Sequence, residues 1–216
     1  MKIINITGRE YNDTVLYISA VFMRLGKNVL IRDMTRKHEM YSAVPHIGGI
    51  TPNEGIIDYR GLGYTFGERN GRCAVYESDY NVLIRLYDAD MDPENSDYTI
   101  YVSDELKSTA DGINKQRCSA SAGSFLIIRN YTGTVRNQFE ELITKNRIKK
   151  TYALLWSTSD ARNSVNSEYR DAIRFDGISL QYKECLLEII AEIYNEIPLK
   201  EIRDAFKSAM KGGRYY

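Results

Sequence analysis

The chain has 216 residues, of which 43% are hydrophobic and 27% are charged, and its 29 basic side chains balance 29 acidic ones. This length suits one α/β domain with a sizeable core, and a net charge of zero gives no reason to expect nucleic-acid binding. The sequence contains no run of about 18 apolar residues that could span a membrane. Cys73, Cys118 and Cys185 lie too far apart in the sequence for a metal-binding pair. We therefore expect a cytoplasmic protein without a metal or another cofactor.

The N-terminal part of the chain predicts a βαβ unit. Residues 2–6 form a short apolar run that ends in a turn at Gly8, which is typical of a strand followed by a turn. Apolar residues recur at helical spacing over residues 15–25, and Gly26 ends this helix. Residues 28–32 (NVLIR) form the next strand. A right-handed crossover makes this strand parallel to the first one.

Strands and helices continue to alternate along the chain. Short runs rich in β-branched or aromatic residues predict four more strands, at residues 81–87, 98–102, 125–128 and 152–156. Helical patterns occupy residues 109–118, 134–146 and 182–194. We therefore expect one α/β domain over residues 1–216, a doubly wound and mostly parallel sheet of six or seven strands with helices on both faces.

Residues 45–79 interrupt this alternation. The segment is rich in glycine and contains Pro45 and Pro52, so we expect a long irregular insertion with a short helix near residues 53–59. Long irregular stretches inside compact domains are often functional. A glycine-rich connection between two strands explains the same composition, and the sequence favours neither interpretation.

The opening of the chain resembles that of the ParA/MinD group of deviant Walker ATPases. Those proteins begin with a strand, an SGKGGVGKTT-like loop, a helix and a GK-x-VLLIDxD strand, and this chain has MKIINITG, a helix and GKNVLIRD. Without a gap, Gly8 falls on the first glycine, Arg9 on the signature lysine and Asp33 on the acidic residue that ends the second strand. The order of elements follows the family over nearly the whole chain. The resemblance implies a nucleotide site at the carboxyl ends of the strands.

The phosphate loop departs from the family pattern. Glu10, Tyr11 and Asp13 fall where glycines let the backbone wrap a phosphate, and Thr14 falls on the phosphate-binding lysine. Val15 replaces the magnesium-binding hydroxyl residue. Carboxylates near the phosphate position would repel a nucleotide. We therefore expect a loop that no longer binds ATP in the ordinary way.

A second departure concerns the family's YDYVIIDTP strand, whose aspartate orders magnesium or the attacking water. Arg85 falls on that aspartate in DYNVLIR, and a cation cannot bind magnesium. The predicted vestigial nucleotide site therefore comprises Gly8, Arg9, Asp13, Thr14, Asp33 and Arg85. Whether Arg9, Asp33 and Arg85 form an internal ion pair or are three solvated charges stays open.

The alternating carboxylates of Asp88, Asp90 and Asp92 have the spacing of calcium ligands at the start of an EF-hand loop. Pro93 stands where that loop needs its glycine, and Thr99 stands where it needs a bidentate glutamate. A solvated loop is therefore the favoured interpretation, and we predict no metal site.

Several residues are candidates for contact with a partner. Tyrosine suits interfaces, although it is also common in half-buried sheet positions. An amphipathic helix at residues 199–211 carries basic residues between its apolar ones, and its apolar side is expected to pack on the sheet unless it meets a membrane or DNA surface. The contact candidates are Tyr11, Tyr59, Tyr64, Ile202, Phe206 and Lys207.

The resemblance and its lost motif together predict a non-catalytic ParA/MinD-like protein. It would serve as a scaffold or localisation factor for a secretion, pilus or partition machine, nearest in role to the TadZ/CpaE-like branch. The expected partners are proteins, in a homodimer or hetero-oligomer, with weak peripheral membrane contact through the C-terminal helix and without nucleic acid. The alternatives are a divergent ATPase or GTPase with a non-standard phosphate loop, and an adaptor for a membrane or DNA surface.

Overall fold

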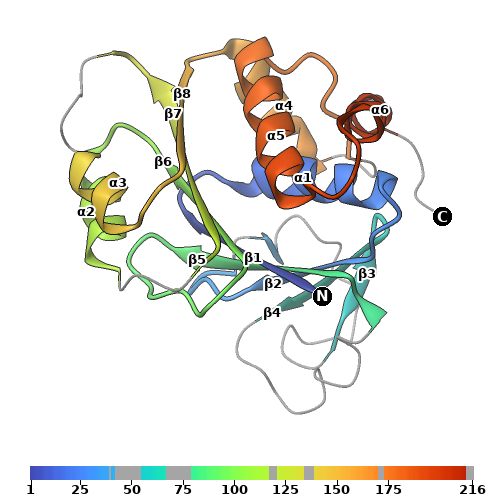
Figure 1. Ribbon diagram of the computed structural model, residues 1–216, viewed down its shortest axis with the longest axis horizontal. Coiled ribbons are helices and arrows are strands. Elements are labelled where there is room, and N and C mark those ends of the chain that lie inside the picture. Colours follow the sequence, from blue (N-terminus) through green and yellow to red (C-terminus); the bar gives the residue numbers. More distant parts are fainter. Residues whose placement is uncertain are drawn as a thin grey trace.

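The computed structural model describes residues 1–38, 40–41, 55–66, 79–116, 121–133, 139–169 and 173–212. In this part of the chain, eight strands form one sheet in the order β3-β4-β2-β5-β1-β6-β7-β8 (Figure 1). Every neighbouring pair is parallel except β3 and β4. The predicted doubly wound, mostly parallel α/β sheet is confirmed, with more strands than the sequence indicated.

The elements have the following bounds. The strands are β1 (Lys2–Gly8), β2 (Val29–Asp33), β3 (Ile57–Tyr59), β4 (Leu62–Phe66), β5 (Val82–Asp88), β6 (Tyr98–Ser103), β7 (Gly123–Tyr131) and β8 (Lys150–Leu155). The helices are α1 (Asn12–Arg24), α2 (Lys107–Lys115), α3 (Glu140–Lys145), α4 (Thr158–Tyr169), α5 (Leu180–Ile193) and α6 (Leu199–Met210).

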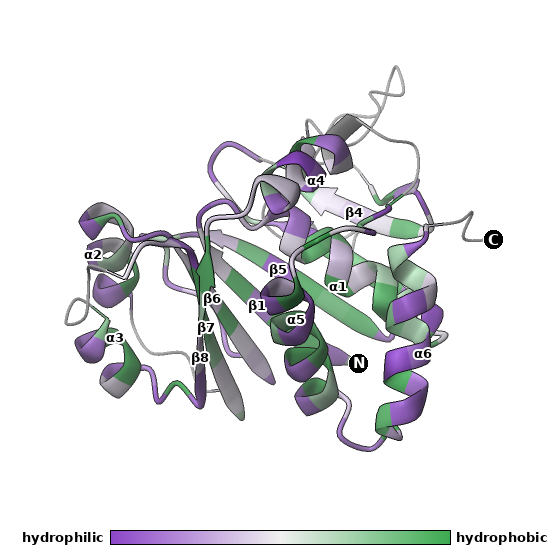
Figure 2. Cartoon of the chain, turned by 90° about the horizontal axis from the view of Figure 1, so that it is seen from above, coloured by the Kyte–Doolittle hydropathy of each residue, from purple (hydrophilic) through white to green (hydrophobic). Residues whose placement is uncertain are grey.

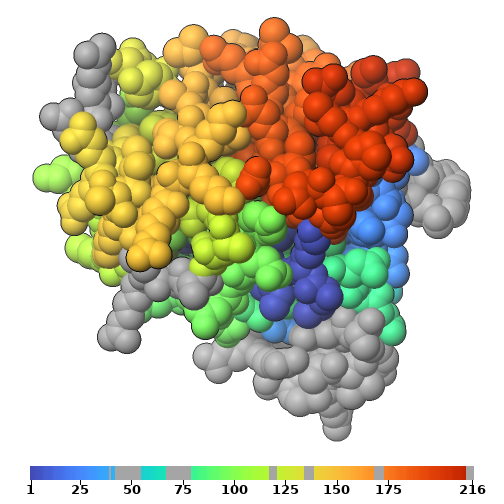
Figure 3. Space-filling model, in the orientation of Figure 1, coloured from blue at the N-terminus to red at the C-terminus, as the bar shows by residue number. Residues whose placement is uncertain are grey.

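One face of the sheet carries the larger core. Because side chains alternate along a strand, Ile4 and Ile6 of β1 point to the same face. There they join one buried cluster with the apolar sides of α1, α5 and α6. Figure 2 shows α1, α5 and α6 together on one side of β6, β7 and β8. In Figure 3 the C-terminal helices, coloured red, lie against the blue N-terminal end of the chain.

The opposite face carries a smaller core. Helices α2 and α3 lie beside β6, β7 and β8, on the side away from α5 (Figure 2). Their cluster includes Ile113 and Leu142 from the helices and Leu126 and Ile128 from β7. Helices therefore cover both faces, as the sequence predicted.

The sequence prediction was wrong within the expected insertion. Residues 57–59 form strand β3 instead of a helix, and β3 pairs with β4 as an antiparallel hairpin. Its two-residue turn has φ of 56° at Arg60 and 77° at Gly61. Positive φ at both positions is typical of a hairpin turn. The predicted insertion's residues 45–54 and 67–78 lie outside the described residues.

Helix α4 was not predicted either. Its sequence, TSDARNSVNSEY, is mostly polar and has no apolar residue at regular helical spacing. Among the described residues, every helix is too short or too polar to cross a membrane.

Candidate functional site

The carboxyl ends of the parallel strands border an open cleft of about 1120 Å³. Its lining comes from the loops that follow β1, β2, β5 and β8, from the last residues of β7 and from sides of α2, α4 and α5. Parallel strands all end at the same edge of a sheet, and α/β proteins bind their ligands at this edge. The cleft is therefore the candidate functional site.

Gly8 ends β1 at this edge, in contact with β6. Its φ is 135°, and a Cβ atom there would lie 1.7 Å from the carbonyl oxygen of Val102. A side chain would also strain the backbone, because L-residues rarely adopt this φ. Glycine at position 8 is thus required by the close approach of the two strands, independently of any ligand.

Asp13 lies in the first turn of α1, and its side chain is turned inward. Arg129 of β7 binds it with both guanidinium nitrogens, Nη1 to Oδ1 at 2.7 Å and Nη2 to Oδ2 at 2.9 Å. The Asp13 side chain is fully buried and that of Arg129 is 10% exposed. The backbone N–H of Thr14 also donates to Asp13 Oδ1 at 2.7 Å. A charge-assisted bidentate ion pair therefore connects the amino end of α1 to β7.

Glu10 and Tyr182 make further contacts with Arg129 and Thr14. Arg129 Nη1 donates to the carbonyl oxygen of Glu10, and its guanidinium lies over the Tyr182 ring, 5.3 Å from the centroid. The hydroxyl groups of Tyr182 and Thr14 form a hydrogen bond of 2.5 Å. Burial raises the pKa of Tyr182, so the phenol stays neutral. Thr14 is fully buried, and its hydroxyl is bonded to Tyr182 of α5.

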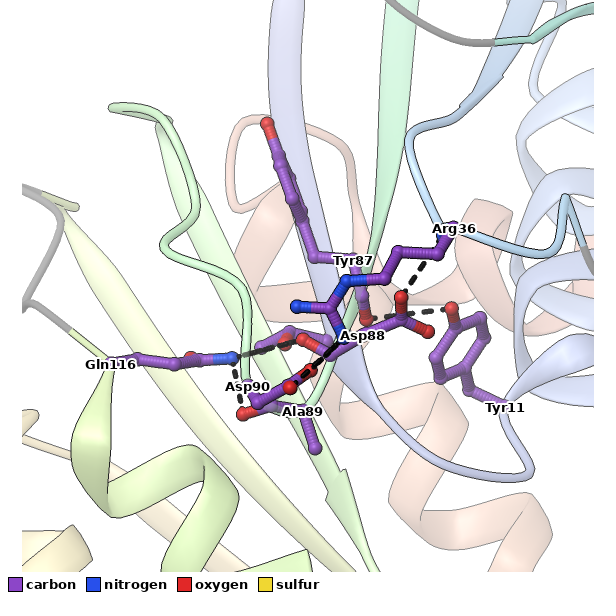
Figure 4. A network of polar contacts seen from close by, with 8 residues as sticks. Tyr11, Arg36, Tyr87, Asp88, Ala89, Asp90 and Gln116 are labelled. Atoms are coloured by element: carbon purple, nitrogen blue, oxygen red, sulfur yellow. Dashed lines mark hydrogen bonds and ion pairs between the residues drawn. The ribbon is translucent and has the colours of Figure 1, made fainter.

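A polar network fixes the loops on the other side of Gly8 (Figure 4). The Arg36 guanidinium binds Asp90 at 2.9 Å, and its backbone N–H donates to Asp88 Oδ2 at 3.0 Å. Gln116, which follows α2, donates through Nε2 to the Thr7 hydroxyl and to the carbonyl oxygens of residues 88 and 89. The end of β5 is therefore connected to the segment after β2, to β1 and to α2.

The structure corrects the place of Arg85. Arg85 lies in register with Asn5, three residues before the paired Gly8 and Asp88 at the edge. Its guanidinium binds Glu94 at 2.8 Å, and Arg85 does not line the cleft. The alignment without a gap to the family's strand placed the end of the strand at Arg85, whereas β5 continues to Asp88. The carboxylate at the carboxyl end of this strand is that of Asp88, which the sequence analysis did not place in the site.

The Asp33 carboxylate is also bonded to residues that do not line the cleft. Its Oδ1 accepts from the N–H and the hydroxyl of Thr35, at 2.9 and 2.6 Å, and its Oδ2 accepts from Met40 N–H at 2.8 Å. Burial raises the pKa of this carboxyl group, and the hydrogen bonds oppose the rise. The ion pair that Arg9, Asp33 and Arg85 were considered to form does not occur. Arg9 is exposed at the mouth of the cleft.

One wall of the cleft carries exposed apolar side chains, at the end of β8 and along α4. We call it the β8–α4 lip and define it as Leu155, Trp156 and Val165. Their exposed fractions are 54%, 62% and 59%. Trp156 is the chain's single tryptophan. Isolated exposed apolar residues are ordinary, whereas three that line one cleft are a candidate contact surface.

Most of the predicted contact residues are unavailable to a partner. Four of them are at most 1% exposed, namely Tyr11, Tyr64, Ile202 and Phe206. The apolar side of α6 packs in the main core, as the favoured interpretation of that helix expected. Lys207 is exposed, and Tyr59 is half-buried beneath the Arg60 guanidinium. A partner contact through the apolar side of α6 would require the helix to leave the core.

The described part of the chain contains no group of three or more His, Cys, Asp or Glu residues arranged to hold a metal ion. Asp88 and Asp90 are instead the acceptors for Arg36. Their spacing in the sequence therefore serves to fix the segment after β2.

Two solved structures are similar to this chain. One is a ParA family ATPase from Chlorobium tepidum TLS, with 11% identity and a TM-score of 0.48 over 95% of this chain and 98% of that chain. The other is a plasmid partition protein from Borrelia burgdorferi, with 16% identity and a TM-score of 0.43 over 96% of this chain and 99% of that chain. No family model and no curated protein sequence matches the chain. What the chain does therefore rests on its own residues and their geometry.

Proposed function

We propose that the chain is a ParA/MinD-like protein that does not turn over a nucleotide. It serves as a scaffold or localisation factor for a secretion, pilus or partition machine, nearest in role to the TadZ/CpaE-like branch. One observation carries the proposal: the buried Asp13 carboxylate, held by Arg129, stands at the amino end of α1. The family resemblance places the phosphates of a nucleotide at this end of the helix.

A magnesium nucleotide held in the family's manner does not fit these residues. The loop has no lysine at position 14, and the Thr14 hydroxyl is bonded to Tyr182 inside the protein. Arg129 is the buried cation of the site, and both ends of its guanidinium are engaged by Asp13. A phosphate approaching this helix end would find the Arg129 guanidinium and the Thr14 N–H already bonded to the Asp13 carboxylate, and it would have to displace that carboxylate.

Contact with proteins is supported by the β8–α4 lip. Its apolar side chains lie at the same edge of the sheet as Arg9 and the β1–α1 loop. The resemblance implies that such proteins dimerise across this face. We infer that a second copy or another protein docks here, with Trp156 at the centre of the contact, since tryptophan is enriched among the residues that dominate binding.

Calorimetric titration of the purified full chain with Mg-ATP, Mg-ADP and Mg-GTP tests the proposal. We expect no heat of binding and no thermal stabilisation at millimolar nucleotide. Micromolar binding with turnover would overturn the proposal. The control is the same titration with Asp13→Asn, a variant that removes the charge of the blocking carboxylate and keeps its shape.

One observation favours a second candidate function, nucleotide binding by a non-standard loop. Asp88 pairs with Gly8 in register and lines the cleft at the end of β5, where its carboxylate could meet a metal-bound ligand. Its Oδ2 accepts from Arg36 N–H, which leaves Oδ1 as the oxygen for such a role. If the titration gives heat, loss of that heat in Asp88→Asn would establish this candidate.

A further inference from the structure

The Asp13 carboxylate accepts hydrogen bonds from donors that other residues of the chain provide. Three N–H groups converge on it, two from the Arg129 guanidinium and one from the backbone of Thr14. Convergent N–H groups at a helix amino end, joined by a guanidinium, are the chemistry that binds carboxylates and phosphates. Asp13 and Arg129 are 116 residues apart in sequence, so the pair joins α1 directly to β7.

Arg129 is held in this position by contacts that do not involve Asp13. Its Nη1 donates to the Glu10 carbonyl, and its plane lies over the ring of Tyr182. Tyr182 in turn bonds to Thr14 on α1. The guanidinium therefore belongs to a framework of the β1–α1 loop, β7 and α5, into which the Asp13 carboxylate fits as the anion.

From this geometry we propose that Arg129 and the amino end of α1 form an oxyanion-binding site that Asp13 fills from within. The internal carboxylate holds the β1–α1 loop closed on β7 and α5 without an external ligand. The inference rests on the proposed lack of nucleotide turnover, since an internal anion here takes the place of a ligand. The ligand class of the site, once Asp13 is truncated, is a small oxyanion of carboxylate size.

Chemical rescue of Asp13→Ala tests the inference. This substitution removes one carboxylate group, and formate supplies a group of the same size and charge. We expect the melting temperature of Asp13→Ala to lie well below that of the unmodified chain in sodium chloride. Sodium formate at the same ionic strength should raise it by several degrees, while the unmodified chain melts at the same temperature in both salts. Equal melting of Asp13→Ala in the two salts would overturn the proposal.

Two matched variants separate a site from a general salt effect. Asp13→Asn fills the same space with a neutral amide, so formate has no room to bind and should give no rescue. The double variant Asp13→Ala, Arg129→Met has the room but lacks the guanidinium, and it should also melt equally in both salts. Rescue that persists in the double variant would contradict the role of Arg129.

A second measurement covers the case in which Asp13→Ala does not fold. Hydrogen exchange of Asp13→Asn, compared with the unmodified chain, should show faster exchange in the β1–α1 loop, which loses its charge-assisted contact with Arg129, while α6 is unchanged. Unchanged exchange in this loop would overturn the inference. These readouts are independent of nucleotide: ATP binding with turnover, together with successful formate rescue of Asp13→Ala, would reject the proposed function and keep the oxyanion site.

Discussion

The two walls of the cleft differ in which side chains they bury and which they expose. The wall formed by the β1–α1 loop and β7 buries a full ion pair, Asp13 with Arg129. The wall formed by the end of β8 and by α4 leaves Leu155, Trp156 and Val165 more than half exposed. Both choices cost stability in the isolated chain, since charges prefer water and apolar surface avoids it.

The contrast supports the proposal that a partner docks at the lip. On the first wall every donor of the Arg129 fork that faces Asp13 is satisfied within the chain, so little is gained there by binding a ligand. On the second wall, burial of the lip by another molecule would recover about 25 cal/mol for each Å² of apolar surface removed from water. Docking at the lip therefore stays the proposal, and the buried ion pair between Asp13 and Arg129 connects α1 to β7.

Breaking the ion pair on one side should have the largest effect on stability. Arg129→Met leaves the buried carboxylate of Asp13 without its partner, and we expect a loss of about 3–5 kcal/mol in the free energy of unfolding. Urea denaturation followed by circular dichroism measures this loss.

The control for that variant removes both charges. Asp13→Asn with Arg129→Met leaves no unpaired charge and should recover a large part of the stability lost in Arg129→Met alone. A double variant as unstable as the single one would show that Arg129 matters for packing and not for its pairing with Asp13.

The hydroxyl of Tyr182 should contribute less. Tyr182→Phe keeps the ring beneath Arg129 but leaves the buried Thr14 hydroxyl without its 2.5 Å partner, so we expect a loss of about 1–2 kcal/mol. The matched variant is Thr14→Val. In a double-mutant cycle by urea denaturation, the two substitutions together should cost less than the sum of the single losses, and strict additivity would exclude a direct interaction.

A smaller effect, of opposite sign, is expected at Glu10. Its φ is 52°, a left-handed conformation that costs a side-chain-bearing residue about 1–2 kcal/mol. Glu10→Gly relieves this strain at the expense of chain entropy, so we expect a net gain of about 0.5–1 kcal/mol in thermal or urea unfolding. Asn130, with φ of 56° on the same cleft, is the control, because asparagine tolerates this region and Asn130→Gly should gain less.

Sequence reasoning found the elements whose apolar residues follow a clear period. The βαβ unit at the start of the chain and the strands β5 to β7 were predicted because buried parallel strands are short apolar runs, and the edge strand β8 was predicted from its run of aromatic and aliphatic residues. The hairpin of β3 and β4 was missed because its signal is a two-residue turn, Arg60 and Gly61, inside a segment rich in glycine. Helix α4 was missed because its residues are mostly polar.

The site was predictable only in part, for a different reason. The position of the β1–α1 loop followed from the fold, but the inward turn of Asp13 depends on Arg129, which no local pattern connects to it. Arg85 was misplaced because a motif match fixes residue spacing and not strand length, and β5 runs three residues beyond it to Asp88. The one available signal for Asp88 was an acidic residue at the end of an apolar run.

The β8–α4 lip should have the smallest effect on stability and the clearest effect on association. Trp156→Ser removes a side chain that is 62% exposed, so we expect a change within about 0.5 kcal/mol in the free energy of unfolding. Phe206→Ala truncates an aromatic side chain that is 1% exposed in the core and should cost about 3–5 kcal/mol in the same assay. This pair of substitutions compares the removal of similar apolar groups from the two environments. If the lip is the docking surface, Trp156→Ser should weaken self-association in sedimentation velocity, and Lys207→Glu, on the exposed side of α6, should leave it unchanged. A chain that is already monomeric at high concentration would exclude a second copy as the occupant of the lip and leave a different protein in that role.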